Sequence, residues 1–82
     1  MKGRYSWWDD PLHREWQARF GARLYELRTA RELTQEELSE MAGITRRAVI
    51  FYERSEQIPR LDVAIKLARA LGVTLDGLVD WR

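Results

Sequence analysis

Apolar residues recur at helical spacing along most of the chain, and no stretch shows the sustained alternation that is typical of a strand. The first such stripe consists of Leu12, Trp16, Phe20, Leu24, Leu27 and Arg31. It follows Asp10 and Pro11, an acidic cap with proline at the first helical position. We expect one long first helix that can bend at Gly21. The alternative is a short helix over residues 11–17 and a second from about residue 18, because glycine inside a helix costs about 1 kcal/mol relative to alanine.

Residues 34–54 have the pattern of two short amphipathic helices joined by a tight glycine turn. Thr34 and Glu37 are spaced as a capping box at the start of the first. The inward face of this helix is expected to hold Leu38, Met41 and Ala42, with Ser39 small enough for close crossing. Gly43 ends the helix in the left-handed conformation. Thr45 then caps the second helix.

The two faces of this second helix follow from a rotation of about 100° per residue. Its inward positions are Val49, Tyr52 and Glu53. Its outward positions are Arg47, Ile50, Phe51 and Arg54. Basic residues gather here, whereas the preceding helix carries Glu36, Glu37 and Glu40.

Two further helices are predicted after Pro59. The apolar face of the first consists of Leu61, Ala64, Ile65, Leu67, Ala68 and Leu71, and Gly72 stops it. Thr74 caps a short last helix, which returns Leu75, Leu78 and Val79 to the core. The fold class is therefore all-α.

The turn and its flanks resemble the lambda-repressor-like, or XRE-type, helix-turn-helix family. The residues that carry the resemblance are Thr34, Gln35, Leu38, Ser39, Gly43, Ile44, Thr45, Val49 and Glu53. The likeness extends over residues 18–81. It implies a five-helix DNA-binding domain over residues 18–82, preceded by an N-terminal aromatic extension over residues 1–17 that includes the start of helix one.

The resemblance also implies roles for particular residues. Arg28 and Glu53 coincide with a partly buried structural ion pair between the first helix and the recognition helix. Gln35 matches a glutamine that bonds a phosphate or a base edge. The remaining candidate DNA contacts are Thr45, Arg46, Arg47, Arg54 and Arg60. Arg47 is expected to read a guanine edge, and the other arginines to contact phosphates. Arg60 replaces the family's usual capping serine or aspartate, so the start of the fourth helix should be less well capped than is usual in the family.

Ile50 and Phe51 depart from the family pattern, in which outward positions of the recognition helix are usually polar. Three interpretations remain open. The two side chains contact thymine methyl groups, they engage a protein partner, or the helix is rotated or shielded, for instance by the aromatic N-terminal arm, so that neither residue is free.

Aromatic residues that precede the matched region, Trp7, Trp8 and Trp16, form a second candidate surface. Trp81, near the other end of the chain, is an alternative contact. Such residues rarely stay in water, so they pack on their own domain or contact a second subunit, and we favour a homodimer contact.

Composition limits the function further. The 82 residues suit one small domain, and the formal net charge of +1 requires charge to be segregated for DNA binding. There is no cysteine, no apolar run long enough for a membrane span, and a single histidine, His13, without metal-ligand spacing. We expect a cytoplasmic, non-enzymatic regulator without cofactor or metal, a dimeric repressor that binds double-stranded DNA. The alternative is a protein-interaction module of the same fold that uses Ile50 and Phe51.

Overall fold

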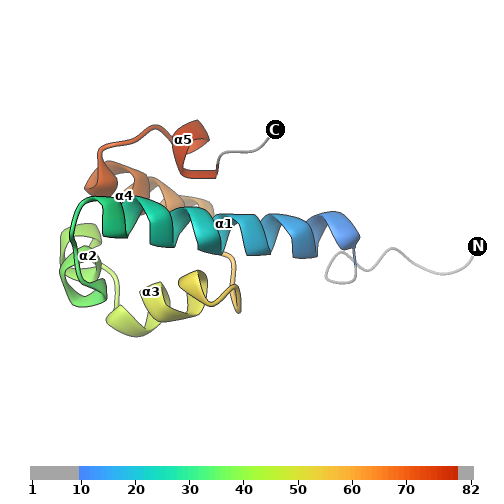
Figure 1. Cartoon of the computed structure of the whole chain (residues 1–82), viewed down its shortest axis with the longest axis horizontal. Helices are drawn as coiled ribbons and strands as arrows, with labels where there is room; N and C mark the ends of the chain where they lie inside the picture. The colour runs from blue at the N-terminus through green and yellow to red at the C-terminus, as the bar shows by residue number, and fades with distance from the viewer. Residues whose placement is uncertain (1–9, 80–82) are drawn as a thin grey trace, which may run out of the picture.

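The computed structural model describes residues 10–79, and every regular element within that range is an α-helix (Figure 1). The elements are α1 (Pro11–Ala30), α2 (Gln35–Ala42), α3 (Arg46–Glu53), α4 (Leu61–Leu71) and α5 (Leu75–Val79). The expected all-α fold of five helices is confirmed. Trp7, Trp8 and Trp81 lie outside the described residues.

Helix α1 is one continuous helix of 20 residues. It begins where the sequence indicated, because the Asp10 carboxylate accepts the Leu12 N–H at 2.9 Å and Pro11 occupies the first turn. The alternative of two helices that divide near residue 18 is wrong. Gly21 is a point of close contact within one helix, since it is buried and a Cβ there would stand 2.7 Å from the carbonyl oxygen of Tyr52.

The other helices are arranged around the C-terminal part of α1 (Figure 1). α1 contacts α3 and α5, α2 contacts α3 and α4, and α4 contacts α5. The core between them contains Phe20, Leu24, Leu27, Leu38, Ala42, Val49, Tyr52, Ala64, Leu67, Ala68, Leu71 and Leu78. The first turns of α1 project beyond this bundle.

Four helices end in the same way, with one residue in the left-handed conformation. Gly43 and Gly72 take it after α2 and α4, both with φ of 72°. Glu32 after α1 (φ 57°) and Ser55 after α3 (φ 62°) take it without being glycine. At each end the next residue's N–H returns to a carbonyl five positions earlier, as Glu56 does to Phe51 at 2.9 Å.

Several apolar residues expected in the core lie on the surface instead. Met41, Leu61 and Ile65 are 55%, 65% and 42% exposed. Leu12 and Leu75 are also exposed. The buried face of α4 is centred on Ala64 to Leu71, so Ile65 lies about 110° away from it around the helix axis. Met41 is displaced by a similar angle from the α2 face that holds Leu38 and Ala42. The periodicity marked apolar faces that are wider than the parts other helices cover.

Candidate nucleic-acid interface

Side-chain caps fix both helices of the turn. Thr34 and Glu37 form the expected capping box at the start of α2: the Thr34 hydroxyl accepts the Glu37 N–H at 3.0 Å, and the Glu37 carboxylate accepts the Thr34 N–H at 2.8 Å. Gly43 turns the chain, and the Thr45 hydroxyl then accepts the Ala48 N–H at 3.1 Å. These caps confirm the predicted start of each helix and set the direction in which α3 leaves the turn.

The inward face of α3 is the one expected from the sequence. Val49 and Tyr52 are buried, and the Glu53 side chain is only 5% exposed. Burial raises the pKa of the Tyr52 phenol, because the phenolate would lose its hydration. The opposite side carries two exposed arginines, Arg47 and Arg54, and two partly exposed apolar residues, Ile50 and Phe51. Arg46, in the first turn, is exposed as well.

Two of the candidate arginines already have carboxylate partners. Arg54 forms an ion pair with Glu56 at 3.2 Å. Arg60 makes a two-pronged contact with Asp62, at 2.9 and 3.2 Å, and this hydrogen bonding holds the pKa of Asp62 below its ordinary value. α4 starts at Arg60 without any side-chain cap, which agrees with the weaker capping that was expected there. Both arginines would have to share or release their partners to bind a phosphate.

The arginines at the start of α3 differ from these two. Within residues 10–79, neither Arg46 nor Arg47 makes an ion pair. Arg47 instead lies over the ring of Phe51, with its guanidinium carbon 5.3 Å from the ring centroid. Such a contact attracts the cation to the aromatic face without neutralising its charge. The N-terminal end of α3 therefore presents two positive groups without carboxylates.

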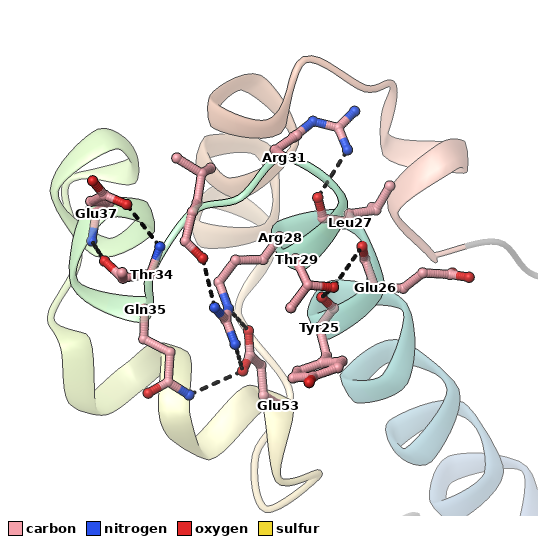
Figure 2. A network of polar contacts seen from close by, with 11 residues as sticks. Tyr25, Glu26, Leu27, Arg28, Thr29, Arg31, Thr34, Gln35, Glu37 and Glu53 are labelled. Carbon is pink, nitrogen blue, oxygen red and sulfur yellow. Dashed lines mark hydrogen bonds and ion pairs between the residues drawn. The ribbon is translucent and has the colours of Figure 1, made fainter.

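A polar network ties the beginning of α2 to α3 through α1 (Figure 2). Arg28 contacts both oxygens of Glu53, at 2.5 and 3.0 Å, and donates to the carbonyl oxygen of Leu33 at 2.7 Å. Hydrogen bonding to Glu53 raises the pKa of Arg28. The side chains are 11% and 5% exposed. A pair buried this far requires both partners, because a single charge left behind would be uncompensated.

Gln35 belongs to the same network. Its amide nitrogen donates to Glu53 at 3.0 Å, which leaves one amide N–H and the amide oxygen for another partner. The sequence indicated a DNA contact for Gln35 but not this bond, because the bond joins residues 18 positions apart.

Tyr25 is a surface residue that the sequence analysis did not identify. It is 55% exposed, and the guanidinium carbon of Arg28 lies 5.4 Å from its ring centroid. In Figure 2, Tyr25 and Gln35 flank the pair of Arg28 and Glu53. The available signal was the spacing of Tyr25 three positions before Arg28, which puts both on one face of a helix.

Comparison with known proteins gives the family. Residues 24–78 match the sequence profile of a helix-turn-helix family. The chain belongs to the lambda-repressor-like, XRE-type helix-turn-helix family. The resemblance drawn from the turn residues is thereby confirmed.

Relatives of this XRE-type chain include repressors and regulators. It is 35% identical over 61 residues to the cryptic phage CTXphi transcriptional repressor RstR of Vibrio cholerae, a match that covers 74% of this chain and 55% of the relative. It is 34% identical over 56 residues to an HTH-type transcriptional regulator of Archaeoglobus fulgidus, covering 68% of this chain and 80% of that one. The chain spans little more than half the length of the phage repressor.

The structure of the restriction-modification controller protein C.AhdI from Aeromonas hydrophila is also similar to this XRE-type chain. The TM-score is 0.74 at 40% sequence identity, over 76% of this chain and 94% of that one. The likeness therefore covers almost the whole controller and about three quarters of this chain.

Outside the turn, the XRE-type chain offers fewer candidate groups. Trp16 is partly buried, with its ring stacked on Phe20 at 5.4 Å between centroids and 1° between planes. His13 lies at the exposed end of α1 beside a shallow hollow lined with Glu56 and Ile58. The part of the chain from residue 10 to 79 contains no cluster of His, Cys, Asp and Glu placed to hold a metal. None of its helices combines the length and apolar character needed to cross a membrane.

Proposed function

We propose that this chain is a sequence-specific DNA-binding transcriptional regulator, a dimeric repressor that reads the major groove with α3. The observation that carries the proposal is the pair of arginines, Arg46 and Arg47, at the capped N-terminal end of α3, neither of which has a carboxylate partner among residues 10–79. Residues at this end of a recognition helix reach base edges in the major groove. An arginine that is not neutralised keeps its N–H donors for guanine or phosphate.

The positioned groups around α3 support the same proposal. Gln35 keeps a free amide N–H at the start of α2, where backbone N–H groups and the helix dipole favour a phosphate. Arg54 and Arg60 lie farther along the chain with carboxylate partners that a phosphate would replace. We assign base readout to Arg47 and phosphate contacts to Gln35, Arg46, Arg54 and Arg60. We also propose that Thr45, which caps α3, contacts DNA.

The names of the relatives agree with a regulator. One is a phage transcriptional repressor and another a restriction-modification controller. We propose repression rather than activation. Which of the two occurs depends on where the operator lies relative to the promoter.

The test is selection of bound sequences from a random DNA pool by the full chain, with Arg47→Ala beside it. We expect a motif for the wild type, and for Arg47→Ala a loss of about 5- to 150-fold in discrimination at one guanine. Affinity should fall with salt, with a log–log slope of about −0.9 for each phosphate contacted. Arg69→Ala, which removes an exposed arginine from α4, is the matched control and should keep the motif. Enrichment of no motif by the wild type would overturn direct readout.

A homodimer is the second part of the proposal. Leu12, in the first turn of α1, is 52% exposed. Trp16 packs against the core through Phe20 but stays partly exposed. The N-terminal part of α1 projects beyond the bundle (Figure 1). Exposed apolar residues of this kind often mark contacts with another subunit. A dimer would bind two half-sites about one helical turn apart.

Sedimentation at two protein concentrations tests the dimer. We expect the wild type to dimerise and Leu12→Glu to weaken the association. Leu61→Glu, at the exposed leucine of α4, is the control. Loss of the dimer with Leu61→Glu alone would place the interface on α4, and a monomer at both concentrations would refute the dimer.

The partly exposed pair Ile50 and Phe51 supports an alternative function, a protein-interaction module. In that case α3 would bind a protein partner, and binding would depend little on salt. Salt-insensitive association that Phe51→Ala removes, together with no selected DNA motif, would favour this second function.

A further inference from the structure

Arg47 and Phe51 form one unit on the outward face of α3. They are four residues apart, so they lie on the same side of the helix, and the guanidinium lies 5.3 Å from the ring centroid. The ring thereby limits the directions that the long arginine side chain can take. Because an aromatic ring accepts no strong hydrogen bond, the N–H groups of Arg47 keep their capacity to donate to an acceptor.

Ile50 and Phe51 have no structural role in the core that would explain their apolar character. Both are partly exposed. Neither belongs to the buried core, nor to the partly buried residues packed against it, within the described chain. The outward face of α3 thus places the apolar side chain of Phe51 directly beside the guanidinium of Arg47.

The bases of duplex DNA offer one apolar group to such a surface. In the major groove, only thymine among the four standard bases carries a methyl group, at C5, whereas guanine offers the two acceptors that match an arginine. The 5.3 Å from the guanidinium carbon to the ring centroid lies between one and two base-pair steps, each of about 3.4 Å. One guanine and one nearby methyl group therefore fit the unit together.

We infer that α3 reads a C5-methyl group on a pyrimidine one or two base pairs from the guanine bound by Arg47, with Phe51 and Ile50 as the methyl-reading residues. This inference rests on the proposed DNA-binding function and specifies its target. The group recognised is the methyl itself. Thymine and 5-methylcytosine are accordingly favoured at that position, and uracil and unmethylated cytosine are disfavoured.

The experiment uses the DNA sequence selected by the wild-type chain and replaces each thymine in turn with deoxyuridine, which removes only the methyl group. We expect one position at which this replacement weakens binding by roughly 3- to 10-fold, the range expected from exposing one buried methyl that packs on a ring. At the same position, 5-methylcytosine should bind more tightly than cytosine by a similar factor. If every deoxyuridine site binds like its thymine counterpart while binding stays sequence-specific and salt-dependent, the inference is wrong and the proposed function stands.

Variants separate methyl reading from guanine reading. Phe51→Ala should abolish the difference between thymine and deoxyuridine, and circular dichroism should verify that it remains folded. Phe51→Leu keeps apolar volume without a ring, so it should keep the methyl preference and relax the guanine preference. Arg47→Ala should bind less tightly but still distinguish thymine from deoxyuridine. A methyl preference that survives both Phe51→Ala and Ile50→Ala would overturn the assignment, and a wild type that binds no duplex would overturn the proposed function and this inference together.

Discussion

Gly21 in α1 lies so close to the end of α3 that a Cβ on it would stand 2.7 Å from the carbonyl oxygen of Tyr52. The same Cβ would stand 2.6 Å from the hydroxyl oxygen of Ser55. The absent side chain lets α1 approach the backbone that follows the recognition helix. Gly21 thus determines how closely α3 is held against the core.

Gly21→Ala should destabilise the fold by about 1–3 kcal/mol, because a carbonyl on a packed backbone cannot move as easily as a side-chain end. Helix propensity alone predicts the opposite sign, a gain of about 1 kcal/mol. Urea denaturation measures the difference. Ala22→Gly, at the exposed neighbouring position, is the control and should cost only the propensity term. A more stable Gly21→Ala protein would show that the approach of the two helices is not tight.

Ser55→Gly should stabilise the protein. Ser55 holds φ at 62°, a conformation that costs a residue with a side chain about 1–2 kcal/mol and costs glycine little. We expect a gain of about 1 kcal/mol, seen as a melting temperature higher by about 4–8 °C in a domain of this size. Gly43→Ser introduces the reverse change at the equivalent position after α2 and should lower the melting temperature. An unchanged melting temperature for Ser55→Gly would mean that the hydroxyl makes a compensating contact.

Glu53→Gln should cost about 3–5 kcal/mol of unfolding free energy, because it leaves the guanidinium of Arg28 buried without a carboxylate. The double variant Arg28→Met with Glu53→Met removes both charges and should cost less than the single change. Glu56→Gln breaks the exposed pair with Arg54 and should cost less than about 1 kcal/mol. Equal effects of Glu53→Gln and Glu56→Gln would contradict a structural role for the buried pair.

Stability should fall at alkaline pH through Tyr52. Burial raises the pKa of its phenol, and the nearby charge of Arg60 opposes this to a smaller extent. A pKa that is higher in the folded state than the unfolded value of about 10 gives stability that is complete below pH 10. That stability is lost as the pH rises through the folded pKa. Unfolding free energies of the wild type and Tyr52→Phe should therefore run parallel below pH 10, and the wild type should decline more steeply above it. Tyr25→Phe, at an exposed ring, is the control, and equal pH profiles for the wild type and Tyr52→Phe would contradict the prediction.

Much of the fold could be predicted from the sequence because its determinants are local. Thr34, Gly43 and Thr45 act on backbone groups within five residues, so their caps and turn follow from residue type and spacing alone. The inward positions Val49 and Tyr52 follow equally from helical rotation about one axis. For the pair of Arg28 and Glu53, the family resemblance indicated contact between residues that spacing could not have joined.

Only the tertiary structure determines the contacts between residues that lie far apart in the chain. The close approach at Gly21 depends on where α3 ends, and the bond from Gln35 to Glu53 depends on how α2 crosses α3. The exposure of Met41 and Ile65 has the same origin, because periodicity marks an apolar face but not how much of it a neighbour covers. Local sequence sets dihedral angles and caps, whereas the position and rotation of one helix against another arise from packing the whole core at once.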